Sequence, residues 1–192
     1  MHSENIKYSY TQEEWDKIGN TLIYLTNEIG SCSKTKLLKL MYILDELSIK
    51  KSGIPFLNLR YELWKFGPVA QDVFVELSST PTRLSPFVKI ENSGNSSFIR
   101  PVASFNDDEF TDNDVDLIKQ VISKYGGKSA KDLIEITHRP NSPWYNTAVS
   151  KGLLDDLLSE EINSTNIKID MAELVTFDER KKQIYQDYIE YH

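Results

Sequence analysis

Histidine and cysteine, which serve in many catalytic and metal sites, are scarce in this chain, and no residue of a catalytic type lies in a pattern specific for one reaction. His138 is the one histidine away from the two ends of the sequence, and Cys32 is the one cysteine. A zinc site needs several converging histidines, cysteines or carboxylates, and no HxxxH or CxxC spacing is present. A site built from His138 and carboxylates stays open as an alternative. We expect no metal, no cofactor and no intramolecular disulfide.

Nucleophilic catalysis and phosphate binding are weakly indicated. Cys32 and His138 would form a nucleophile–base pair only if the fold brought them together, so the simpler interpretation is a small buried cysteine and a hydrogen-bonded histidine. Gly126-Gly127-Lys128-Ser129 resembles the end of a phosphate-binding loop, but Ile122 occupies the position of the earlier glycine that such a loop needs. We interpret this stretch as a helix end followed by a serine cap. The sequence predicts a protein that is not an enzyme, with a hydrolase using His138 as an alternative.

Composition and charge narrow the classes of partner. The chain has 192 residues, 40% hydrophobic and 27% charged, and a formal net charge of −7. No apolar run approaches the roughly 18 residues of a membrane span, and the first residues lack the apolar segment of a signal peptide. We expect a cytoplasmic protein with no membrane partner. The negative charge argues against broad binding to nucleic-acid phosphates.

The charge is unevenly distributed along the chain. Residues 31–75 contain seven lysines and arginines against four acids, whereas residues 104–119 contain six acids and one lysine. A DNA-binding regulator, possible alongside other roles, would use the basic residues of the first region, which are Lys34, Lys36, Lys39, Lys50 and Lys51. The simpler interpretation is a solvated helix surface, because exposed helix faces are usually charged.

Helical periodicity dominates the chain. Thr11 and Glu14 have the spacing of a capping box, and apolar residues follow at helical spacing, so the sequence predicts a helix over 11–29. Ser33 caps a second helix, which ends at Gly53. Further helices are expected from residue 111 or 112 to 125, after Ser129, from Pro143 towards Gly152, and in a C-terminal helical tail over 170–192.

The period changes to two between Leu57 and Phe66, which predicts a strand. Gly67 breaks this strand, and Pro68 suits the first position of the helix that we expect to follow. Residues 86–102 predict a hairpin about a turn centred on Gly94, and we expect this hairpin and the strand at 57–66 to form one small sheet. The prediction is a mainly α (α+β) fold, a single domain over 1–192 with a small antiparallel sheet.

Two corners combine a tryptophan with a proline. One runs from Trp64 to Pro68 and the other from His138 to Trp144. Because tryptophan has a large apolar area and one N–H that needs an acceptor, the simpler interpretation is that the corners pack near each other and join the sheet to the helices. Lys65 is the member of the first corner that we expect to face outward.

The two corners, together with the second helix, resemble the Panacea antitoxin domain, also described as SocA-like or, in phage proteins, GepA-like. The resemblance extends over roughly residues 15–150 in three motifs: a KLxKLLY-type helix, a WxYGPV-type corner with Phe66 in place of tyrosine, and a segment ending in Thr-His and Pro-Trp. The matching positions are Lys36, Leu37, Lys39, Leu40, Tyr42, Trp64, Lys65, Gly67, Pro68, Val69, Thr137, His138, Pro143 and Trp144.

This resemblance implies a mainly α fold and a non-catalytic antitoxin that binds and neutralises a protein toxin. It also implies that some relatives present their toxin to a protease. An acidic surface suits a toxin with a basic active site, and tyrosines suit protein interfaces. The candidate partner-binding residues are therefore Asp107, Asp108, Glu109, Asp112, Asp114 and Asp116, with Tyr185, Tyr188 and Tyr191 in the tail.

Overall fold

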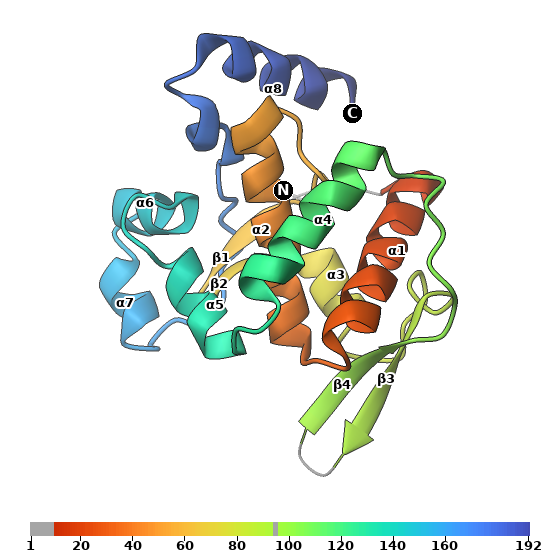
Figure 1. The fold of residues 1–192 in the computed structure, drawn as a ribbon. Coiled ribbons are helices and arrows are strands. Elements are labelled where there is room, and N and C mark those ends of the chain that lie inside the picture. The colour runs from red at the N-terminus through yellow and green to blue at the C-terminus, as the bar shows by residue number, and fades with distance from the viewer. Residues whose placement is uncertain (1–9, 94–95) are drawn as a thin grey trace, which may run out of the picture.

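The structure, a computed structural model, describes residues 10–93 and 96–192 and is mainly helical within them (Figure 1). Its first elements are α1 (Gln12–Ile29), α2 (Lys34–Ser52), β1 (Tyr61–Trp64), β2 (Gly67–Ala70), α3 (Gln71–Glu76), β3 (Val88–Ser93) and β4 (Ser96–Pro101). The chain continues through α4 (Asp112–Tyr125), α5 (Ala130–Thr137), α6 (Pro143–Ser150), α7 (Leu154–Leu158), the 3-10 helix η1 (Met171–Val175) and α8 (Glu179–Tyr191). The predicted class, mainly α with a small antiparallel β component, is confirmed.

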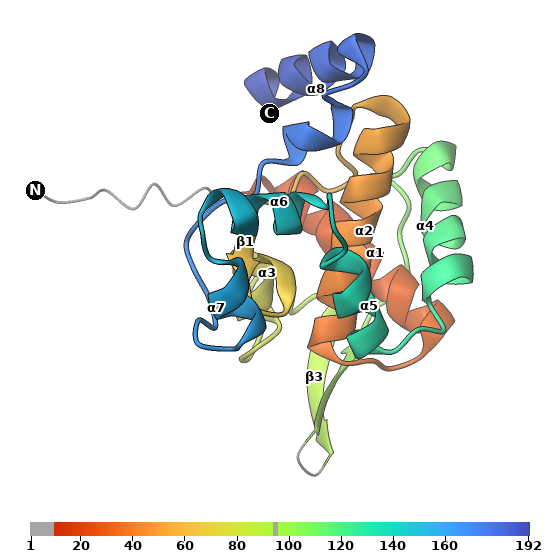
Figure 2. The same cartoon turned by 90° about the vertical axis from the view of Figure 1, so that its left-hand side faces the viewer.

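Helix α2 is the central element of the fold. Eleven of its residues, including Lys39, Asp45 and Glu46, are buried, and α3, α4, α5, α8, β2 and η1 pack around it (Figures 1 and 2). Ser33 caps its start through the N–H of Lys36, and Gly53 ends it in a left-handed conformation. Because α2 is surrounded, its polar side chains must find partners inside the protein.

The local helix signals predicted from the sequence are present. Thr11 and Glu14 form the expected capping box of α1, Ser129 caps α5, and Pro143 is the first residue of α6. The tail consists of η1, which Asp170 caps, and of α8. None of the helices in the described part of the chain has the length and apolarity needed to span a membrane.

Two predictions about the strands are wrong. Residues 67–70, with Pro68, do not begin a helix: they form β2, which pairs with β1 in an antiparallel hairpin, and α3 begins only at Gln71. The hairpin of β3 and β4 does not join β1 either, because the described residues form two separate two-stranded sheets. The predicted turn at Gly94 lies outside the described residues.

The free edge of β1 is covered by a distant extended segment, which explains why the second hairpin is not needed there. Leu63 donates its N–H to Ile167 O at 2.9 Å, Lys65 donates to Asn163 O at 3.0 Å, and Ile169 donates to Tyr61 O at 2.9 Å. The backbone donors and acceptors of this edge are thereby satisfied inside the chain. The β3–β4 hairpin instead packs on α1 and extends away from the helices (Figure 1).

Candidate functional site

Three sequence motifs that are far apart in the chain meet at a buried corner beside α2. Lys39 is only 1% exposed, and its Nζ donates a hydrogen bond to Pro68 O at 2.7 Å. No carboxylate of the described residues forms an ion pair with it. Burial lowers the pKa of Lys39 to about 7. Lys39 therefore joins α2 to the β1–β2 hairpin as a buried amine rather than as a surface charge.

Gly67 allows this close approach. Its φ of +97° lies in the region that glycine tolerates best, and a Cβ built on it would lie 2.6 Å from Thr137 Oγ1 and 3.2 Å from Lys39 Cε. Thr137 is itself buried, donating to Ile134 O and accepting from Ser142 Oγ through its carbonyl. The glycine is thus enclosed between α2 and the end of α5.

The two tryptophan corners are in contact, as the simpler interpretation predicted. Trp144 is fully buried, and its Nε1 donates to Trp64 O at 2.8 Å. His138 stacks on the Trp144 ring with centroids 3.8 Å apart. Within the first corner, Phe66 rather than Lys65 is the outward residue: Phe66 is 47% exposed, whereas Lys65 forms an ion pair with Glu160.

His138 has the surroundings of a packed histidine. Burial, with the charge of Lys39 as a smaller cause, lowers its pKa to about 4, and its Nε2 is buried without a hydrogen-bond partner among the described residues. A base with so low a pKa is poorly matched to catalysis near neutral pH. The described residues also contain no group of three or more histidines, cysteines, aspartates or glutamates placed to hold a metal ion.

Other motif positions also contribute to the core. Leu37, Leu40, Val69 and Pro143 are buried, and the buried Tyr42 ring packs edge-on against Tyr61 at 5.0 Å. Lys36 donates to Gly126 O at 2.7 Å and so joins α2 to the end of α4.

Sequence reasoning missed Asp45, which organises the segment leading into β1. Its carboxylate accepts from the N–H groups of Leu57, Asn58 and Leu59 and from Tyr61 Oη at 2.7 Å. Burial raises the pKa of Asp45, and these four hydrogen bonds oppose the rise.

Glu46 beside Asp45 forms ion pairs with Lys50 and Arg139. The signal was available, since apolar residues on nearly every side of a helix predict that its charged residues are buried too.

The basic residues of α2 do not present a continuous cationic face. Lys39 is buried at the corner, Lys36 is bonded to α4, Lys34 donates to Ser78 and Lys50 pairs with Glu46. This distribution gives little support to DNA binding through α2.

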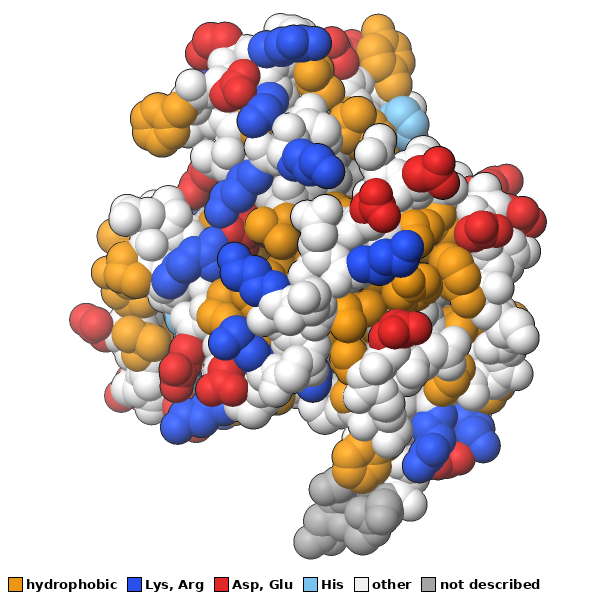
Figure 3. Space-filling view, viewed as in Figure 1, with side chains coloured by type: hydrophobic (Ala, Val, Ile, Leu, Met, Phe, Trp, Pro, Cys, Tyr) orange, Lys and Arg blue, Asp and Glu red, His pale blue; other side chains and the backbone are white. Residues whose placement is uncertain are grey.

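The acidic stretch is mostly open to solvent. Asp107, Asp108, Glu109, Asp112 and Asp116 are exposed. Asp114 differs, because it completes the capping box of α4 with Thr111 and forms an ion pair with Lys17 at 3.3 Å. Figure 3 shows acidic side chains at the upper right of the molecule, where α4 begins.

The tyrosines of α8 are the second group of candidate residues. No residue of α8 is buried, and Tyr191 is strongly exposed while Tyr185 and Tyr188 are half-buried. Burial raises the pKa of Tyr188, and the charges of Glu14, Asp45 and Asp114 raise it further, in that order. Of the candidate acids, Asp114 is the one whose charge acts on Tyr188.

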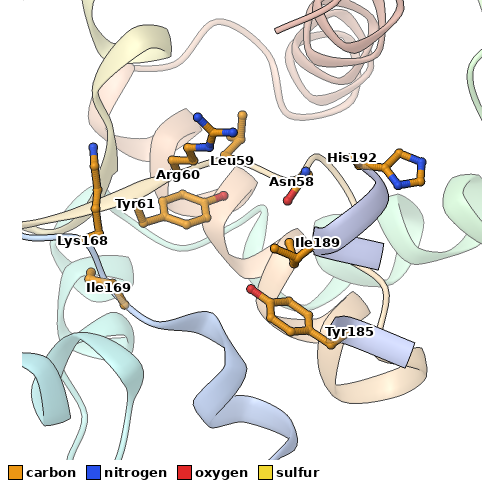
Figure 4. Close-up of a pocket in the computed structure, with 9 residues that line it drawn as sticks. All are labelled: Asn58, Leu59, Arg60, Tyr61, Lys168, Ile169, Tyr185, Ile189 and His192. Carbon is orange, nitrogen blue, oxygen red and sulfur yellow. The ribbon is translucent and has the colours of Figure 1, made fainter. Parts of the chain in front are cut away.

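Two hollows border these candidate residues. One, of about 430 Å³, lies between α8 and the segments 58–61 and 168–169, and is lined on the α8 side by Tyr185, Ile189 and His192 (Figure 4). The other, of about 310 Å³, is lined by α1, the 86–87 segment and the 103–109 segment; its charged lining residues Asp16, Asp108 and Glu109 are all acidic.

Comparison with known proteins identifies a family. Residues 37–145, more than half of the chain, match a family model described as antitoxin SocA-like, Panacea domain. The matched range contains the motif positions from Leu37 to Trp144 and the acidic stretch, and it ends before α8. Searches of curated proteins and of solved structures found no match.

Proposed function

Because the chain belongs to the SocA-like Panacea antitoxin family, we propose that it is a cytoplasmic antitoxin that neutralises a cognate protein toxin by binding it directly. The proposed contact surface, called here the acidic–tyrosine surface, consists of Asp107, Asp108, Glu109, Asp112, Asp116, Tyr188 and Tyr191. The observation that most supports it is the exposure of these acids and of Tyr191, in contrast to the largely buried motif residues.

Physical chemistry favours this surface over the motif residues. Exposed tyrosines supply large contact area at small entropic cost, and clustered carboxylates attract a basic partner and accelerate encounter. The motif residues of the corner are largely buried and bonded to one another, so a partner has little access to them. A toxin that acts on RNA or nucleotides has the basic active site that such an acidic surface would cover.

The proposal is tested by co-expressing the chain with the protein encoded beside it. Growth rescue together with a stable co-purified complex is the expected result. Absence of both toxicity and a complex would overturn the antitoxin assignment for that pair. Measuring the cellular level of the toxin separates two modes of neutralisation: blocking leaves the toxin level unchanged, whereas presentation to a protease lowers it.

The hydrolase alternative has its own test in His138→Ala. Loss of any hydrolytic activity with retained folding would favour an enzyme. Loss of folding would agree with the packing of His138 on Trp144.

A further inference from the structure

Helix α8 packs on the end of α2 less closely than α4 and α5, which contribute buried residues to the core. It contains no buried residue. The preceding η1 is anchored by the buried Met171 and Val175, and the joint between η1 and α8 contains Phe177, which is 103% exposed. The joint is held by a backbone hydrogen bond from the N–H of Asp178 to Val175 O at 3.1 Å and not by the phenylalanine side chain, so α8 follows a fixed element through a segment with little side-chain packing.

Helix α8 contacts the end of α2 at one small site, called here the seat, which consists of Gly53 and Lys50 at the end of α2 and Lys181 and Ile184 in α8. A Cβ at Gly53 would lie 2.5 Å from Lys181 O and 3.2 Å from Ile184 Cβ. Lys181 Nζ also donates to Lys50 O at 2.8 Å, in the last turn of α2. Gly53 is therefore both the left-handed end of α2 and the place where the backbone of α8 comes closest to it.

Beyond the seat, α8 does not close fully onto the protein. The hollow of about 430 Å³ separates Tyr185 and Ile189 from Leu59 and Tyr61 (Figure 4). The opposite wall does not depend on α8, because Asp45 holds the backbone of residues 57–59 and Ile169 is hydrogen-bonded to Tyr61. One wall of the hollow is thus fixed by the core. The other is a helix whose closest contacts with α2 lie in its first turn and a half, with Tyr185 partly buried against the core.

We propose that α8 is a hinged strap that undocks as a unit about residues 176–178, uncovering the apolar wall formed by Leu59, Tyr61 and Ile169. Loss of the seat at Gly53 releases the strap while the buried corner stays intact. A helix of 13 residues is marginal in water on its own, so the undocked strap loses its helical hydrogen bonds. The strap goes beyond the proposed antitoxin function and is tested without a toxin, so the failure of one does not imply the failure of the other.

Amide hydrogen exchange on the full chain tests the strap. In the wild-type protein we expect the amides of residues 182–191 to exchange together, at least about tenfold faster than those of the middle of α2, as in other local unfolding reactions. Gly53→Ala should accelerate α8 exchange by roughly another fivefold or more and leave α5 and α6 unchanged, because the added methyl group displaces Lys181.

The matched control is Gly152→Ala. Gly152 also has a positive φ, +67° against +82° for Gly53, but a Cβ there meets nothing within 4 Å, so it adds comparable backbone strain without touching α8. Lys181→Met is a second, milder variant that removes the hydrogen bond to Lys50 and keeps the glycine. Exchange in α8 as slow as in α2, or equal α8 exchange in Gly53→Ala and Gly152→Ala with no acceleration in Lys181→Met, would overturn the strap.

Discussion

The buried corner and the acidic–tyrosine surface differ in how their residues are used. At the corner, Lys39, Gly67 and Trp144 are enclosed, and their polar atoms are bonded to backbone carbonyls of other elements. On the acidic–tyrosine surface, the side chains are exposed or half-buried. Its acids form no long-range ion pair among the described residues. The motif residues therefore hold the fold together, and the residues proposed to contact a partner lie outside the motifs.

If this division is correct, the largest loss of stability should follow from a change at the corner. Trp144→Ala removes a fully buried indole and leaves Trp64 O without its donor. We expect the free energy of unfolding to fall by about 3–5 kcal/mol, measured by urea denaturation. A loss below about 1 kcal/mol would show that the corner does not hold the sheet to the helices.

Gly67→Ala should have the next largest effect. The added Cβ would overlap Thr137 Oγ1 and strain a backbone with φ of +97°, for which we expect a loss of roughly 2–4 kcal/mol in the same assay. Gly152→Ala is the control, because its site is open and only the backbone penalty of about 1 kcal/mol applies. Equal losses in the two variants would contradict the close packing of Gly67 against Lys39 and Thr137.

Lys39→Met should change the pH dependence of stability. The folded pKa of about 7 lies below the ordinary lysine value of 10.5, so between these values the unfolded chain binds more protons and stability rises with pH. Below about pH 7 the full cost of burying the charged amine is present. From pH 7 to 9 we therefore expect the stability of the wild type to rise by on the order of 2 kcal/mol relative to Lys39→Met. Parallel stability profiles of the two proteins over this range would contradict a buried, titrating Lys39.

The helices were the most predictable part of the molecule. The serine and threonine caps of α1, α2, α4 and α5 are local signals, and each capping side chain bonds to a backbone N–H three residues later. Such signals do not depend on the rest of the fold, which is why their positions could be assigned from the sequence.

The strands show where local signals fail. Gly67-Pro68 has the signature of a strand end followed by a helix start, yet tertiary pairing with β1 overrides it. The segment 163–169 has no strand pattern strong enough to predict that it covers β1. Both errors arise because pairing in a sheet depends on residues distant in sequence.

The candidate site was predictable only in part. The contact of the two tryptophan corners could be anticipated from their composition, and the exposed acids from their density. The effect of the Glu14 and Asp114 charges on the pKa of Tyr188 could not, because it depends on how α8 folds back over the end of α2 (Figure 2). Asp45 was missed because the helix pattern was interpreted as one apolar side rather than as a surrounded helix.

The smallest effect on stability, and the largest on binding, is expected on the acidic–tyrosine surface. Replacing Asp107, Glu109, Asp112 and Asp116 with their amides should change the free energy of unfolding by no more than about 1 kcal/mol, because these side chains are exposed. The matched control replaces four exposed acids elsewhere, namely Glu28, Glu135, Asp155 and Glu161. Both variants carry the same net charge, so any difference between them reports position.

The most direct test of the account is the affinity of these two variants and of the wild type for the toxin, measured by titration at several salt concentrations. We expect the variant of the acidic–tyrosine surface to bind at least about tenfold more weakly at low salt and to lose most of its salt dependence, with the control close to wild type. Equal affinities of all three proteins at every salt concentration would contradict the claim that this surface, and not the buried corner, recognises the partner.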